Sequence, residues 1–160
     1  MVTRLVVAVA LAVALVAASL PAVDAAREER TKARLDAELT RVADAARSLP
    51  ETEDAAGDTS LAARRVVAVS VPERSLTTAS VDYVELAGGD VSVGASFSYR
   101  LAGREETTHR LTGVPLSTPT GPVRLSATGT QRLALSLVER GRGRLVTLRR
   151  LEADDVGGAA

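Results

Sequence analysis

The chain has 160 residues, with twenty basic residues balanced by twenty acidic ones, a single histidine and no cysteine. A formal net charge of zero argues against nucleic acid as the partner, and the lack of cysteine excludes disulfides and thiolate metal sites. With only two tyrosines and one phenylalanine, any core must be built from Val, Leu and Ala. The basic residues are nearly all arginine, which fits a high-GC genome, halophilic or otherwise.

The first feature along the chain is an uncharged run of sixteen residues, from Leu5 to Leu20. At about 1.5 Å per residue it spans about 24 Å, and continuing to Ala26 supplies the rest of a ~30 Å hydrocarbon core. We therefore expect residues 1–26 to form a transmembrane anchor that contacts membrane lipid. Its anchor residues are Leu5, Val9, Leu11, Val13, Leu15, Val16 and Leu20.

Two other interpretations of this run stay open. It can be a cleaved signal peptide, with Arg4 in a short basic leader and Val23-Asp24-Ala25 before the cut. It can also be a buried helix of a soluble domain. Small residues recur every four positions in the run, which permits close packing with a second copy of the helix.

Residues 27–49 predict an amphipathic helix that continues from the apolar run, bends at Pro21 and ends at Pro50. Apolar residues recur at spacings of four and three and form a helix-packing seam: Leu35, Leu39, Val42, Ala46 and Leu49. The seam packs either on the protein's own β-rich domain, which is the interpretation we favour, or against another copy.

Residues 50–63 are acidic and poor in large apolar side chains, and we expect a linker there. From residue 64 the hydrophobic period changes to two, predicting a β-rich domain over residues 64–151 and a disordered tail over 152–160. The predicted strands, including one from Leu76 with Ala79, Val81 and Tyr83 on one face, cover these ranges: 66–71, 76–86, 91–101, 106–111, 123–127, 131–138 and 144–151.

Together these features predict an α+β protein. A transmembrane and amphipathic N-terminal helix precedes a small antiparallel β-sandwich or curled sheet. Short strands with turns every 8–14 residues are typical of such a sheet.

No pattern in the sequence demands a reaction, and we expect no catalytic residue, cofactor or metal site. His109 is the only histidine, and no nucleophile motif accompanies it. The acidic residues of the linker lack the spacing of a calcium loop: Glu51, Glu53, Asp54 and Asp58. The densest basic group has no interleaved aromatic residues, which argues against single-strand binding: Arg140, Arg142, Arg144, Arg149 and Arg150.

The layout of LVVAVALAVALVAASLPAVDAA followed by the seam from Leu35 to Leu49 resembles that of type IV pilins and pseudopilins. In that family the apolar half-helix anchors the subunit in the membrane and later packs in a filament core. The chain is also similar to small uncharacterised haloarchaeal single-span membrane proteins with "SLPAVDAAR"-like text, a likeness that implies an archaeal lineage but no activity.

These resemblances imply a non-enzymatic, membrane-anchored structural or interaction protein, such as a minor pilin-like or accessory subunit of a pilus or secretion assembly. Lys and Arg counts near the ends of the run favour the C-terminal part inside the cell. The pilin resemblance implies the opposite, an extracellular domain with protein partners in a surface assembly, and we expect that orientation. The alternative is a secreted β-domain that binds an envelope component after signal-peptide cleavage.

Overall fold

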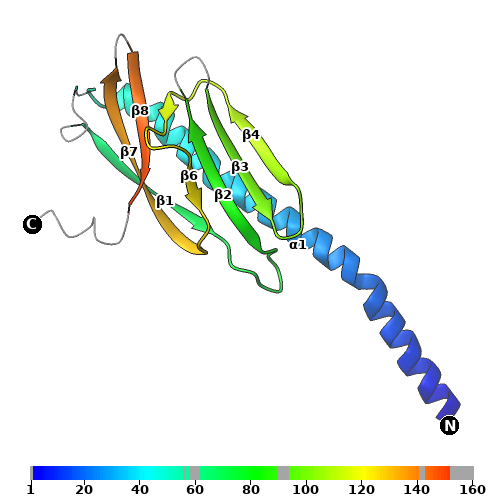
Figure 1. Ribbon diagram of the computed structural model, residues 1–160. Helices are drawn as coiled ribbons and strands as arrows, with labels where there is room; N and C mark the ends of the chain where they lie inside the picture. Colours follow the sequence, from blue (N-terminus) through cyan, green and yellow to red (C-terminus); the bar gives the residue numbers. More distant parts are fainter. Residues whose placement is uncertain (1, 56, 58–61, 90–93, 141–142, 152–160) are drawn as a thin grey trace, which may run out of the picture.

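The structure, a computed structural model, describes residues 2–55, 57, 62–89, 94–140 and 143–151. One long helix, α1 (Val2–Thr52), projects from one end of a β-rich body, as Figure 1 shows. The N-terminal half of α1 stands away from the strands, while its C-terminal half lies along them. A single element therefore belongs to both parts of the molecule.

The helix runs through both of its prolines. Pro21 lies inside it, and it ends at Thr52 rather than at Pro50. A proline lacks the backbone N–H that would donate to the carbonyl four residues earlier, so each of these prolines removes one hydrogen bond from the helix. The guanidinium of Arg144 donates a hydrogen bond to the carbonyl of Pro50 at 3.1 Å, which satisfies one of the acceptors at the helix end.

The strands of the described residues form two four-stranded sheets. The first has the order β1-β7-β8-β5, made of β1 (Arg64–Val71), β7 (Gly129–Arg140), β8 (Gly143–Arg150) and β5 (Leu116–Ser117). The second has the order β4-β3-β2-β6, made of β4 (Glu106–Leu111), β3 (Ala95–Leu101), β2 (Val81–Gly88) and β6 (Val123–Leu125). Neither sheet closes on itself, and the predicted α+β class with antiparallel-rich sheets is confirmed.

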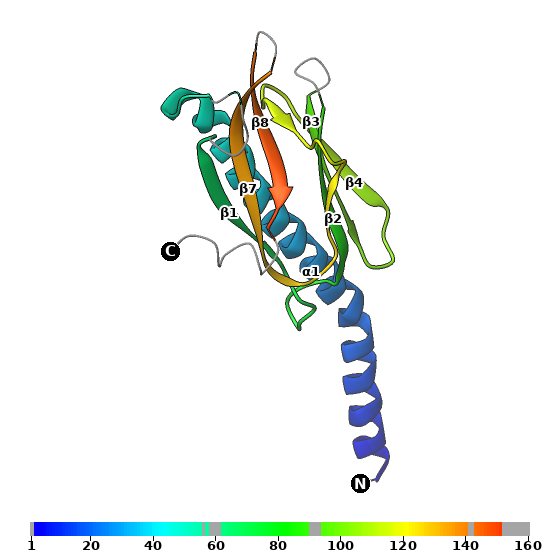
Figure 2. The same ribbon diagram turned by 60° about the vertical axis from the view of Figure 1, so that its left-hand side comes forward.

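The two sheets meet along one side and α1 fills the space along the other (Figure 2). The helix contacts the outer strand of each sheet. The backbone N–H of Ser70 on β1 donates to the Glu38 carboxylate at 3.3 Å, and the imidazole of His109 on β4 lies 3.6 Å from the Asp36 carboxylate. Covering an edge strand in this way prevents it from pairing with another chain.

The helix-packing seam lies inside the core that α1 shares with both sheets. All five of its side chains are at most 3% exposed: Leu35, Leu39, Val42, Ala46 and Leu49. They pack in one cluster with apolar side chains of the strands, such as Val69 of β1, Phe97 of β3 and Leu148 of β8. The structure thus places the seam within this protein's own domain.

A close backbone contact joins the two sheets where β2 ends. A Cβ atom on Gly88 would lie 2.5 Å from the carbonyl oxygen of Leu116, so only glycine fits there. The Thr118 hydroxyl both accepts from the Gly88 N–H at 3.1 Å and donates to the Gly88 carbonyl at 3.2 Å. Here β5 also pairs with β8 in parallel, an exception to the predicted antiparallel arrangement.

The prediction for the second strand was wrong in two respects. The strand begins at Val81, because the preceding residues form a loop tied to α1. A register shift between Val81 and Tyr83 places these residues on opposite faces, so that Val81 joins the core while Tyr83 lies on the outer face of the sheet. Such a bulge inserts a residue and reverses the alternation that follows it.

The other strands lie close to the predicted ranges, with differences of a few residues at their ends. Leu133, Leu135 and Leu137 share the buried face of β7, each with 0% exposure. On β3 the alternation holds from Ala95 to Leu101. Several predicted features lie outside the described residues: Val91 and Val93, Asp90 in the hairpin loop, and the tail at 152–160.

Truncating the seam tests how much the folded domain depends on α1. Leu35 is 1% exposed, and we expect Leu35→Ala to lower the free energy of unfolding by about 2–5 kcal/mol because it leaves a cavity. Val66 on the outer face of β1 is 42% exposed, and Val66→Ala should change it by less than about 0.5 kcal/mol. Urea unfolding of the full chain in detergent, followed by circular dichroism, measures both. Equal losses of unfolding free energy in the two variants would contradict the burial of the seam.

Candidate functional site

The projecting half of α1 exposes an unusual series of apolar side chains. Its apolar side chains are more than half exposed, although they would normally be buried: Leu5, Val6, Val7, Val9, Leu11, Val13, Leu15, Val16 and Leu20. All seven predicted anchor residues are among them. By length and composition this is the one helix of the described chain that could span a membrane.

Charged residues mark the point where this apolar half ends. Asp24 is the first after Arg4, and its carboxylate pairs with the Arg27 guanidinium at 2.9 Å. Glu28 pairs with Arg104, which lies in the turn after β3. The first buried side chain of the described helix is Thr31. The change from the exposed apolar surface of α1 to its buried face therefore takes about two helical turns.

A second distinctive surface is the outer face of the β4-β3-β2-β6 sheet, where one aromatic ring organises several charges. The guanidinium carbon of Arg124 lies 3.7 Å from the centre of the Tyr83 ring, and that of Arg100 lies 5.4 Å from it. The Tyr83 hydroxyl donates to the Glu106 carboxylate at 2.7 Å. Arg124 also lies 4.0 Å from Glu85, as the neighbouring strand register requires.

This network shifts the pKa values of two of its members, Tyr83 and Glu106. The hydrogen bond to Glu106, followed by burial, raises the pKa of Tyr83. The same hydrogen bond from Tyr83, followed by one from Ser98, lowers the pKa of Glu106 below its ordinary value. Because each charge faces an opposite charge or a donor, the surface is suited to stabilising the sheet, and nothing in it resembles an unpaired catalytic acid or base.

The only histidine of the chain lies beside a groove between α1 and β4. The His109 ring stacks on Phe97 and Tyr99, with ring centres 5.7 Å and 6.1 Å apart, and its Nε2 faces the Asp36 carboxylate. The groove holds about 290 Å³, too little for most ligand pockets. Within the described residues, no hydroxyl group donates a hydrogen bond to His109 as a nucleophile would.

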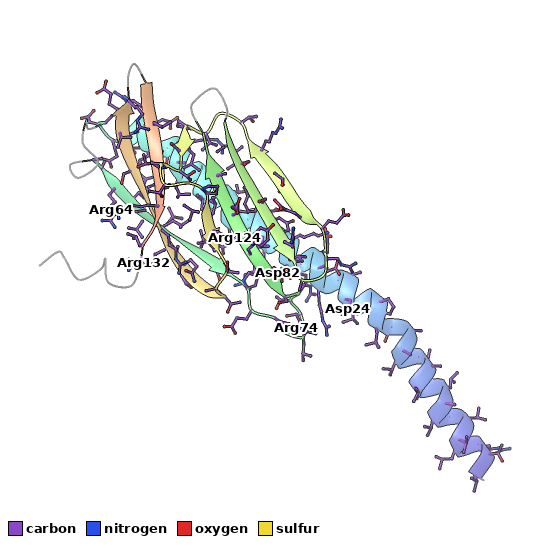
Figure 3. The ribbon with its side chains drawn as sticks, in the orientation of Figure 1. Asp24, Arg64, Arg74, Asp82, Arg124 and Arg132 are labelled. Carbon is purple, nitrogen blue, oxygen red and sulfur yellow. The ribbon has the colours of Figure 1, made fainter. Side chains whose placement is uncertain are left out.

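A shallow hollow of about 500 Å³ opens on the outer face of the β1-β7-β8-β5 sheet. Three of its residues lie opposite one another across neighbouring strands: Arg64, Ser136 and Thr147. Figure 3 shows Arg64 and Arg132 on this sheet and Arg124 on the other. The hollow has a mixed polar and apolar lining, and its described lining residues include no Asp, Glu or His that could act as a catalytic acid or base.

The remaining polar residues that the sequence singled out are the acidic residues of the predicted linker and the basic group near the end of the chain. Among the described side chains, no group of three or more His, Cys, Asp or Glu residues gathers to hold a metal ion. Glu51 lies in the last turn of α1, and Asp58 is outside the described residues. In the basic group Arg144 contacts Pro50, Arg140, Arg149 and Arg150 are exposed on β7 and β8, and Arg142 is not described.

A comparison with protein-family models matches residues 2–151 to the domain of unknown function DUF7311. The chain belongs to this family. The match begins within the projecting helix and ends at the last described strand, so the DUF7311 unit includes the apolar helix together with the β-rich body. No curated protein and no solved structure matches the chain.

Two features of this DUF7311 protein could not be seen in the sequence. The Tyr83 network depends on the bulge after Val81, and no local residue signals that bulge. The contacts between α1 and the loop after β1 join residues about fifty positions apart, such as Arg27 and Leu76. The only sequence signal for that loop was its Ser- and Thr-rich composition after Pro72.

The Glu106 network predicts a pH dependence. Because the pKa of Glu106 is lower in the folded state, its stabilisation is present above the ordinary carboxyl pKa and is lost as the pH falls through the lowered value. We expect the urea midpoint of the wild type to fall more than that of Glu106→Gln between about pH 5 and about pH 3.

The neighbouring Glu105, which is exposed and outside this hydrogen-bond network, provides the control. Glu105→Gln should show the same acid limb as the wild type. If Glu105→Gln and Glu106→Gln had the same pH profile, the network would contribute nothing to acid sensitivity.

Proposed function

We propose that this protein is a single-span membrane protein that displays its β-rich body outside the cell and acts through protein contacts, as a minor pilin-like or accessory subunit of a pilus or secretion assembly. The observation that carries the proposal is the division of α1. One half is exposed and apolar from Leu5 to Leu20, and the other half is a core element of the folded body.

The energetics of the exposed half support anchoring. Its nine Leu and Val residues contribute on the order of −3 to −5 kcal/mol to membrane insertion, and burial in lipid removes the cost of exposing them to water. Apart from the hydrogen bond that Pro21 removes, the helix satisfies its own backbone hydrogen bonds, as any spanning segment must. Leaving this surface in water would make the protein aggregate.

The arrangement also supports assembly with other copies or partners. In the pilin-like layout a continuous helix links an apolar stem to a β-rich head. In α1 the exposed apolar residues 5–20 form the stem, and the helix continues from them into the body without a break at Pro21. Ala and Val side chains give the stem a smooth surface, and small residues permit helices to approach closely. The body adds no acid, base or nucleophile arranged for a reaction in its described part, which supports a non-enzymatic role.

A secreted form is the second candidate, favoured by one observation. The first buried residue of the described helix is Thr31, so a cut after Ala25 would remove only exposed residues. The body would then keep its whole seam. In that case the protein would act as a soluble β-domain on an envelope component.

Placing a charge in the middle of the stem tests the anchor. Arg near a helix centre costs about 2.5–3.5 kcal/mol, which cancels most of the insertion energy of the run. We expect Val13→Arg to move the protein out of the carbonate-resistant membrane fraction, and out of any filaments sheared from the cell surface. Val66 is also an exposed valine, on the outer face of β1, and Val66→Arg is the matched control.

The wild type and Val66→Arg should remain in the membrane fraction. If Val13→Arg also remained there, the stem would not be a membrane anchor. Absence of the wild type from the sheared filaments, with normal membrane retention, would reject the filament subunit and leave a membrane-anchored accessory protein.

A further inference from the structure

The loop between β1 and β2 lies at the end of the body from which α1 emerges, as Figures 1 and 2 both show. Leu76, in this loop, is 83% exposed, more than any other large apolar side chain of the described residues, including those of the stem. A largely exposed leucine next to a membrane anchor lies within reach of the apolar acyl chains of the lipid.

Hydrogen bonds fix the height of this loop relative to the helix. The Arg27 guanidinium donates to the carbonyl of Leu76 at 2.7 Å. The backbone N–H of Ala79 donates to the hydroxyl of Thr31 at 2.9 Å, and that hydroxyl donates to the carbonyl of Arg27 at 2.8 Å. The loop therefore moves with the first turn of α1 beyond the apolar stem.

The length of the stem places that turn in the headgroup layer. The uncharged residues between Arg4 and Asp24 span about 28 Å at about 1.5 Å each, close to the ~30 Å hydrocarbon core. Arg27 then lies about 4–5 Å beyond the boundary marked by Asp24. The headgroup layer is about 5–8 Å deep on each side, so the Leu76 backbone falls within it.

The same end of the body has a hollow of about 310 Å³ that three arginines line: Arg27, Arg74 and Arg104. Asp24 pairs with Arg27, and Glu28 pairs with Arg104. Among the described residues Arg74 has no ion-pair partner, and Figure 3 shows it at the same end of the molecule as Asp24. A phosphate group fits an arginine in this position.

We propose that the loop of residues 72–80 is a second membrane contact, which docks on the lipid surface beside the anchor. Leu76 enters the boundary between headgroups and acyl chains, and Arg74 binds a lipid phosphate. This inference rests on the anchoring proposed above. The anchor and the loop would together fix the tilt of the body relative to the membrane. An anchoring helix alone would let the body tilt freely.

The chain has no tryptophan, so single-tryptophan variants report depth directly. The full chain is reconstituted in phosphatidylcholine vesicles brominated either near the headgroup or near the chain end. We expect Leu76→Trp to show blue-shifted emission that the shallow bromine quenches most. Val16→Trp, in the middle of the stem, should be quenched most by the deep bromine.

Thr112→Trp is the control for the far end of the body. Thr112 follows β4, whose last residue lines the groove beside Ala43 and Arg47, about 24–30 Å along the helix from Arg27. Neither lipid should quench it. Quenching of Val16→Trp without quenching of Leu76→Trp would overturn the second contact and leave the anchor intact. If Val16→Trp were not quenched either, both proposals would fail.

Adding Arg74→Glu to Leu76→Trp tests the phosphate contact. The quenching of Leu76→Trp should fall at least severalfold, because the reversed charge repels the phosphates. Arg110→Glu, on β4 and away from this end, should leave it unchanged. Quenching that is the same in both double variants would refute the role of Arg74.

Discussion

The packing of the α1 seam against both sheets is the interaction on which the rest of the structure depends. In the described part of the chain, the two sheets contact each other along one side, near Gly88 and Thr118. On the other side the helix supplies the apolar surface that closes the core, and Leu35, Val42 and Ala46 are almost fully buried there. Without the helix, the inner faces of both sheets would lie open to water.

This dependence links the exposed apolar half of α1 to the folded body. The helix passes from stem to seam without a break, so any orientation imposed on the stem is passed rigidly to the body. The contacts of Glu38 with β1 and of Asp36 with β4 hold the body on two sides of the same helix. If the apolar half is anchored as proposed, the helix also sets the orientation of the body.

The sequence was informative where a pattern was local and repeated. Period-two alternation located β3 and β7, the spacing of Leu35 to Leu49 located the face of the helix that is buried, and the uncharged run located the stem. These elements were sufficient for the α+β class. The seam alone, however, could not distinguish packing on the body from packing on another copy, because both bury the same side chains.

The missed features all depend on contacts between distant residues. The bulge at Val81 turns Tyr83 outward, and only the strand register reveals it. The parallel pair of β5 and β8 involves two residues of β5, too few to produce a hydrophobic pattern. Likewise, the Arg27 contact with Leu76 follows from how the loop folds back on α1, which composition alone does not predict.

The mass and N-terminal sequence of the mature protein isolated from its native cells would show whether α1 keeps its apolar half. We expect residues 5–20 to be retained and the protein to be recovered with the membranes. A mature chain that begins at Ala26 would contradict this expectation, because the stem would then be absent from the working protein and α1 would serve only as a core helix.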